Sequence, residues 1–138
     1  MMTKEEKIQN VIRTAHEYLG KPYKKTARFY EAPEVFNCST FTKFIFEKVG
    51  KNLPKKAITQ ASRGRKVNRK NIKPADLVFI RGKAGYYNNK FPDGIGHVGI
   101  FIGNNKVVSA RSLPEKVVEE PLKNYLEREQ LRVIRRLI

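Results

Sequence analysis

The hydrophobic period of the chain changes near residue 73, and this change restricts the possible folds more than any other feature. Before it, apolar residues recur at helical spacing over 3–19 and 38–49. After it, short apolar runs bounded by turn residues are typical of strands. Helices followed by strands predict an α+β fold, with N-terminal helices packed on a C-terminal antiparallel sheet. The first three predicted strands are 77–80, 97–102 and 106–110.

The remaining segments complete this outline. Gly, Asn, Tyr and Lys dominate 81–96, which predicts a long loop of the kind that often borders a site. The stretch 63–73 is interpreted as a connector within one domain, because apolar patterning resumes directly after it. We therefore expect a single domain, 1–138. The other predicted elements are a loop over 23–35, a helix over 54–63, a strand at 117–118, a helix over 122–127 and a strand over 131–138.

Cysteine and histidine are scarce in this chain. One cysteine excludes an intrachain disulfide framework, and together with two histidines it is too little for a structural zinc site. No apolar run is long enough to span a membrane, and the first residues lack the apolar segment of a secretory signal. We therefore expect a cytoplasmic protein, or an extracellular or wall-associated one if another route exports or releases it. The sequence indicates no oligomeric state.

The net charge of +16 is concentrated in one acid-free interval between Glu47 and Asp76. Such a field attracts polyanions, which include nucleic acid, an anionic cell-wall polymer and an acidic membrane surface. The alternative is a solvated face without a dedicated partner. No zinc finger, aromatic RNA-binding signature or helix-turn-helix pattern favours nucleic acid. The cations of this basic stretch, 48–73, are Lys48, Lys51, Lys55, Lys56, Arg63, Arg65, Lys66, Arg69, Lys70 and Lys73.

Cys38 is the single cysteine, and it begins the helical run 38–49. Unpaired backbone N–H groups and the positive end of the helix dipole stabilise an anion in a first turn. We therefore expect the pKa of the Cys38 thiol to be lowered, which favours a nucleophile. The alternative is a small buried hydrophobe, the usual state of a free cysteine.

His97 opens the predicted strand 97–102. Alternation places His97 and Gly99 on one face of the strand and the Val and Ile residues on the other. The bare Gly99 leaves room for another group, which fits a histidine that receives a helix-borne cysteine as a thiolate–imidazolium pair. The alternative is a half-buried histidine bonded to the backbone.

Three motifs occur in a fixed order along the chain: 36–41 (FNCSTF), 73–79 (KPADLVF) and 96–103 (GHVGIFIG), with GKPY at 20–23 upstream. In sequence and spacing they resemble the NlpC/p60 family of papain-like cysteine peptidases. The resemblance implies a papain-like α+β fold and hydrolysis of amide bonds in bacterial cell-wall (peptidoglycan) stem peptides, typically next to D-glutamate. It also implies that no metal or organic cofactor takes part.

The resemblance assigns roles to five residues besides Ser109. Cys38 would be the catalytic nucleophile, with its own backbone N–H as an oxyanion donor, and His97 the general base and later the acid. Tyr23 matches a tyrosine beside the cysteine that positions substrate or stabilises the oxyanion, and Ser39 matches a residue near the N-terminal end of the substrate. Asn37 stands where the family usually has an aspartate that holds a free substrate amine. Without that charge, we expect a weaker preference for a free N-terminal stem peptide.

Ser109 occupies the place of the third catalytic residue, where the family usually has His, Asn or Gln. Its hydroxyl can accept a hydrogen bond from Nδ1–H of His97, directly or through a water. A three-residue loop, 103–105, places Ser109 and His97 on the same face of the hairpin, whereas a two-residue turn at 104–105 places them on opposite faces. We expect the odd-numbered loop and Ser109 as the orienting residue.

Three functions follow from these observations. The first is a cysteine hydrolase of the cell wall, held near an anionic polymer by the basic stretch. The second is a binding module of the same fold for cell wall or nucleic acid, in which the changed third position has weakened catalysis. The third is an acyl- or amide-transferring enzyme that uses the same thiol on lipid substrates.

Overall fold

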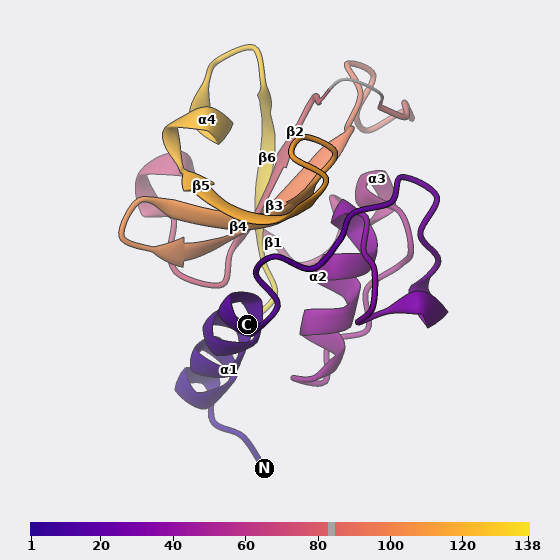
Figure 1. Ribbon diagram of the computed structural model, residues 1–138. Helices are drawn as coiled ribbons and strands as arrows, with labels where there is room; N and C mark the ends of the chain where they lie inside the picture. Colours follow the sequence, from indigo (N-terminus) through magenta and orange to yellow (C-terminus); the bar gives the residue numbers. More distant parts are fainter. Residues whose placement is uncertain (83–84) are drawn as a thin grey trace.

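Six antiparallel strands form one sheet in the computed structural model, which describes residues 1–82 and 85–138 (Figure 1). Their order across the sheet is β1-β6-β2-β3-β4-β5. Helices come first and most of the sheet follows, which confirms the predicted α+β fold. The strands are β1 (Arg65–Lys66), β2 (Leu77–Ile80), β3 (His97–Gly103), β4 (Lys106–Arg111), β5 (Lys116–Pro121) and β6 (Leu131–Arg136).

The helices lie against both faces of this sheet. On one face the Val and Ile side chains of β3 pack with α1 and α2 in the larger core, and on the other Phe101 packs with Tyr125 and Val107. Figure 1 shows α1 and α2 on one side of β3 and β4 and α4 on the other. The face that carries His97 is therefore also buried, because α4 covers it. The helices are α1 (Lys4–Glu17), η1 (Phe29–Glu31), α2 (Cys38–Glu47), α3 (Ala57–Gln60), η2 (Arg69–Asn71) and α4 (Lys123–Leu126).

The first helix confirms its predicted start. Thr3 is the N-cap, and its hydroxyl accepts from the Glu6 N–H while the Glu6 carboxylate accepts from the Thr3 N–H. This reciprocal capping box satisfies two backbone donors that a helix start leaves unpaired. None of the helices in the described part of the chain is long and apolar enough to cross a membrane.

The segment after α2 differs most from the prediction. The helix expected over 54–63 is reduced to the single turn of α3, because the chain bends at Gly64 (φ +73°) into β1. β1, which was expected to be part of a connector, pairs with the end of β6. A Cβ at Gly64 would lie 2.5 Å from the Arg136 carbonyl oxygen, so this close approach requires glycine. Exposed arginine and lysine side chains form β1, so no apolar pattern marks it as a strand.

The β3–β4 hairpin combines a two-residue turn with a bulge. Asn104 and Asn105 have φ values of 51° and 58°, as a tight hairpin turn requires, so the three-residue loop was a wrong prediction. The register then shifts between Phe101 and Gly103, which adds one residue to β3. Beyond this bulge Ile100 faces Val108, which is the register that the three-residue loop was expected to give.

Candidate active site

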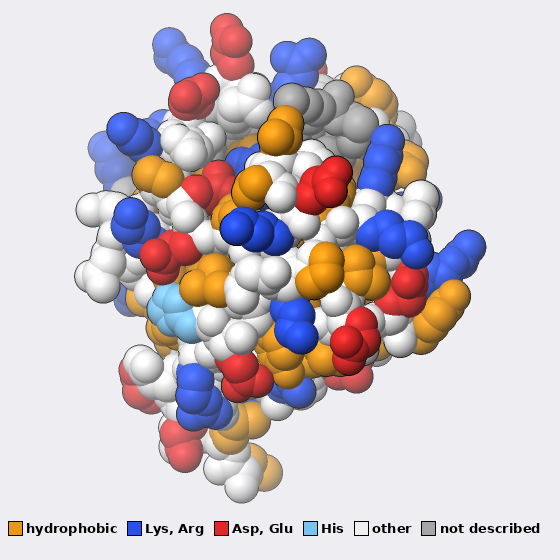
Figure 2. All heavy atoms as spheres, viewed as in Figure 1, with side chains coloured by type: hydrophobic (Ala, Val, Ile, Leu, Met, Phe, Trp, Pro, Cys, Tyr) orange, Lys and Arg blue, Asp and Glu red, His pale blue; other side chains and the backbone are white. Residues whose placement is uncertain are grey.

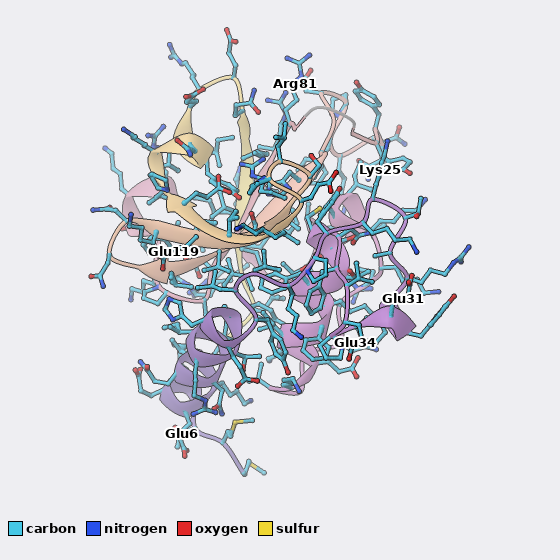
Figure 3. The ribbon with its side chains drawn as sticks, in the orientation of Figure 1. Glu6, Lys25, Glu31, Glu34, Arg81 and Glu119 are labelled. Atoms are coloured by element: carbon cyan, nitrogen blue, oxygen red, sulfur yellow. The ribbon has the colours of Figure 1, made fainter. Side chains whose placement is uncertain are left out.

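Asn37 sets the start of α2 and hence the position of Cys38. Its Oδ1 accepts from the Thr40 N–H at 2.9 Å, and its Nδ2 donates to the carbonyl oxygens of Lys25 and Ala27 at 3.2 Å each. The loop that carries Lys25 (Figure 3) is thereby fixed to the helix start. Both ends of the amide are used within the protein, so Asn37 caps the helix and anchors the preceding loop. Its predicted contact with substrate stays a prediction.

Cys38 is the first residue of α2, as predicted, and it remains partly accessible. The backbone N–H groups of Val98 and Ser39 lie close enough to its sulfur to favour a thiolate, so the sulfur lies beside the start of β3. Burial nevertheless raises the pKa of the thiol, and these N–H groups and the Arg111 guanidinium offset it only in part. The expected lowering of the pKa is therefore wrong, because the helix start is embedded against the sheet.

His97 is buried, and its Nε2 faces hydroxyl groups. The Tyr125 hydroxyl lies 2.9 Å from Nε2 and the Ser109 Oγ lies 3.1 Å from it. Burial, together with the nearby positive charge of Arg111, holds the pKa of His97 well below its ordinary value. Both pKa directions favour a neutral thiol and a neutral imidazole over the thiolate–imidazolium pair expected from the sequence.

Ser109 reaches His97 directly, on the predicted face of the hairpin. The contact is to Nε2, however, and the nitrogen expected from the sequence was Nδ1. With Nε2 engaged by hydroxyls, Nδ1 is the ring nitrogen that remains to exchange a proton with a thiol. The catalytic roles of these residues stay predictions.

Tyr23 and Ser39 also lie next to Cys38. Tyr23 is held there by a backbone hydrogen bond to Glu115 at 2.9 Å and a bridge to Phe36. Burial and the Cys38 sulfur raise the pKa of Tyr23, so its phenol stays protonated and can donate. The buried Ser39 hydroxyl donates to Asn37 Oδ1 at 3.2 Å.

Three residues of the site were not predicted from the sequence. Tyr125 is fully buried and contacts both His97 and Ser109. Arg111 donates two hydrogen bonds of 2.9 Å to Glu120, and its guanidinium lies 5.2 Å from the centre of the Tyr125 ring. The β4–β5 register alone does not indicate this ion pair, because Arg111 faces Lys116 and Glu120 faces Val107. The long Arg111 side chain reaches along the strands to Glu120.

Comparison with known proteins identifies the family. The model of the NlpC/P60 family matches residues 20–136. The chain belongs to the NlpC/P60 family. This match includes Cys38, His97 and Ser109, and it confirms the resemblance noted in the three motifs.

Two curated proteins and one solved structure illustrate the relationship. The probable endopeptidase p60 of Listeria grayi is 36% identical over 97 residues, which are 70% of this chain and 17% of that protein. The gamma-DL-glutamyl hydrolase of Bacillus subtilis is 35% identical over 108 residues, 78% of this chain and 24% of that protein. The chain thus spans about a quarter or less of these relatives. The structure of NlpC2 from Trichomonas vaginalis superposes with a TM-score of 0.80 at 19% identity, over 99% of this chain and 48% of that one, which confirms the fold.

Proposed function

We propose that this chain is a cysteine hydrolase that cleaves amide bonds in the stem peptides of bacterial cell wall. The observation that carries the proposal is the position of the Cys38 sulfur, at the start of α2 and against the backbone N–H that follows His97. Family membership and the curated relatives, one of which is a gamma-DL-glutamyl hydrolase, support this substrate class. We expect the cleaved bond to lie next to D-glutamate.

The reaction begins from a neutral pair of side chains. As the Cys38 sulfur attacks the substrate carbonyl, its proton moves to Nδ1 of His97, and the C–N bond then breaks as this proton passes to the leaving amine. Water attacks the resulting thioester and gives a proton to Nδ1, and the acid leaves as the thiol is restored. The Tyr23 hydroxyl and the Cys38 N–H donate to the oxyanion formed in each half of the reaction.

Defined stem peptides with free and blocked N-termini, analysed by mass spectrometry, test the proposal. We expect cleavage by the native chain and a loss of about 10²–10⁴-fold or more in Cys38→Ala and His97→Ala. His16→Ala is the matched control, because His16 is exposed and bonds only Glu119 among the described residues. Undiminished cleavage by Cys38→Ala would refute the proposal.

A second candidate function is binding to an anionic polymer through the basic stretch. Nine of its ten cations are exposed, and none is within salt-bridge distance of an acid in the described residues. On the face shown in Figure 2, by contrast, acidic side chains lie among the lysines and arginines. An unneutralised cluster attracts polyanions at low salt. We propose that it holds the chain near an anionic wall polymer, with nucleic acid as the competing ligand to be measured beside it.

A further inference from the structure

Four side chains form a hydrogen-bonded group next to Nε2 of His97: Tyr125, Ser109, Glu120 and Arg111. The Tyr125 hydroxyl and the Ser109 Oγ, both near Nε2, are 2.7 Å apart. Ser109 Oγ also lies 3.4 Å from Glu120 Oε2, the longest contact of the group. Two hydrogen bonds from Arg111 hold that carboxylate in place. Because each hydroxyl has a single proton, the donors of this network can be assigned one by one.

The Glu120 carboxylate sets the direction of the network. Paired with the Arg111 guanidinium, it is an anion and can only accept. If Ser109 directed its proton elsewhere, its oxygen lone pairs would face this anion, which is unfavourable. With the Ser109 proton on Glu120, the Tyr125 hydroxyl donates to the Ser109 oxygen. Both oxygens then present lone pairs to Nε2 of His97, which must therefore carry a hydrogen.

Packing fixes the position of the Tyr125 hydroxyl. A Cβ at Gly99 would lie 3.0 Å from both the hydroxyl oxygen and Cε2 of Tyr125, so the ring occupies the space that glycine leaves open. That space, expected from the sequence to receive the cysteine, is filled from α4 instead. Burial raises the pKa of Tyr125, so its hydroxyl keeps the proton that the network needs.

We propose that Glu120, Ser109 and Tyr125 form a directional chain of hydrogen bonds that holds His97 in the Nε2–H tautomer and leaves Nδ1 unprotonated. Tyr125 and Ser109 together contact Nε2, where the resemblance implied a single orienting side chain. All three are positioning residues, since they act through His97. Their effect on catalysis rests on the proposed hydrolase function, but the tautomer itself does not.

The tautomer is measured by ¹⁵N NMR on the full chain with ¹⁵N-labelled histidine, near neutral pH and without substrate. We expect His97 to show a protonated Nε2 and an unprotonated Nδ1, with exposed His16 as the internal reference. In Ser109→Ala the Tyr125 hydroxyl loses its acceptor and turns to Nε2, so the Nδ1–H form should increase. Tyr125→Phe should keep Nε2–H, because the Ser109 oxygen remains as its acceptor. An Nδ1–H histidine in the native chain, or no change in Ser109→Ala, would overturn the proposal.

Hydrolysis by the same variants gives a second readout. Tyr125→Phe should lower kcat about five- to tenfold with little change in KM, the effect of one lost hydrogen bond. Ser109→Ala should lower kcat further than Tyr125→Phe does. Adding Tyr125→Phe to Ser109→Ala should restore part of the lost kcat, because it removes the misdirected Tyr125 hydroxyl. A purely structural role of these residues does not predict such a recovery. A double variant worse than Ser109→Ala would contradict the chain. If the native chain cleaves no stem peptide, the hydrolase proposal fails while the NMR result still decides the tautomer.

Discussion

The ring of Tyr125 lies across the bare backbone of Gly99, at a distance that leaves no space for a methyl group. A Cβ at this position would lie 3.0 Å from the Tyr125 ring and 2.5 Å from Val107 Cγ1. Gly99 therefore affects His97 indirectly, because its missing side chain leaves room for the Tyr125 hydroxyl that contacts Nε2.

Gly99→Ala should consequently displace Tyr125 and lower stability. We expect a loss of about 1–3 kcal/mol in the free energy of unfolding, the usual cost of overpacking, measured by urea denaturation. Val107→Ala added to Gly99→Ala should recover part of this loss by removing the shortest contact. A Gly99→Ala variant of native stability with an unchanged His97 tautomer would contradict this account of the packing.

The reactivity of Cys38 should increase with pH well above neutrality. Since burial raises the pKa of its thiol, the thiolate fraction is smaller than in free cysteine and increases about tenfold per pH unit below that pKa. Alkylation rates should therefore be measured from pH 6 to 10. Cys38 should react more slowly than a free thiol at pH 6–7, and the two rates should converge at high pH.

Arg111 tests the cause of this pH dependence. Its positive charge lowers the thiol pKa, so Arg111→Gln should slow alkylation further at a given pH, whereas exposed Arg128→Gln should not. If Cys38 is alkylated faster than free cysteine at pH 6, its thiol pKa is lowered, as the helix start alone predicts, and this account of burial is wrong.

Asn37→Asp should weaken the fold although aspartate is an equally good N-cap. Aspartate cannot donate to the carbonyl oxygens of Lys25 and Ala27, so two hydrogen bonds are lost. We expect a loss of about 1–2 kcal/mol in the free energy of unfolding. Asn68→Asp is the control, since Asn68 caps η2 through its Oδ1 and its amide donates no hydrogen bond within the described residues. Equal effects of the two changes would argue against the anchoring role of Asn37.

The basic stretch should contribute a salt-dependent affinity for anionic polymer. Replacing Arg65, Lys66, Arg69 and Lys70 with glutamine should weaken binding to an anionic wall polymer and reduce its dependence on salt, because fewer counterions are released. Replacing the four exposed cations Lys4, Arg13, Lys106 and Lys123 removes the same charge elsewhere. Equal losses in the two variants would mean that net charge alone attracts the polymer.

Local patterns in the sequence predicted the elements of the site but not its electrostatics. The helical period located Cys38 in a first turn, and the strand pattern located His97, because both depend on neighbouring residues. The pKa direction of Cys38 was wrong, because it depends on how deeply the sheet buries the helix start. No local pattern could predict Tyr125, which reaches His97 from α4 across 28 positions of the chain.

The register of the β3–β4 hairpin was predicted correctly, although the loop length used to predict it was wrong. The predicted face of Ser109 relative to His97 required an odd number of residues between the paired positions. The structure supplies it with a bulge after Phe101 and a tight turn at Asn104 and Asn105. A bulge shifts the strand register by one residue, just as one more loop residue does. The sequence could therefore predict which face of the hairpin Ser109 occupies without predicting the loop length.

Trapping the covalent intermediate on the single cysteine tests the central claim most directly. A stem peptide is mixed with the native chain, quenched in acid within the first turnover, and the protein is weighed intact and mapped by proteolysis. We predict a mass increase equal to the acyl half of the substrate, confined to the peptide that contains Cys38 and absent in Cys38→Ala. Rapid cleavage with no such adduct, retained in Cys38→Ala, would contradict the claim that this sulfur attacks the substrate.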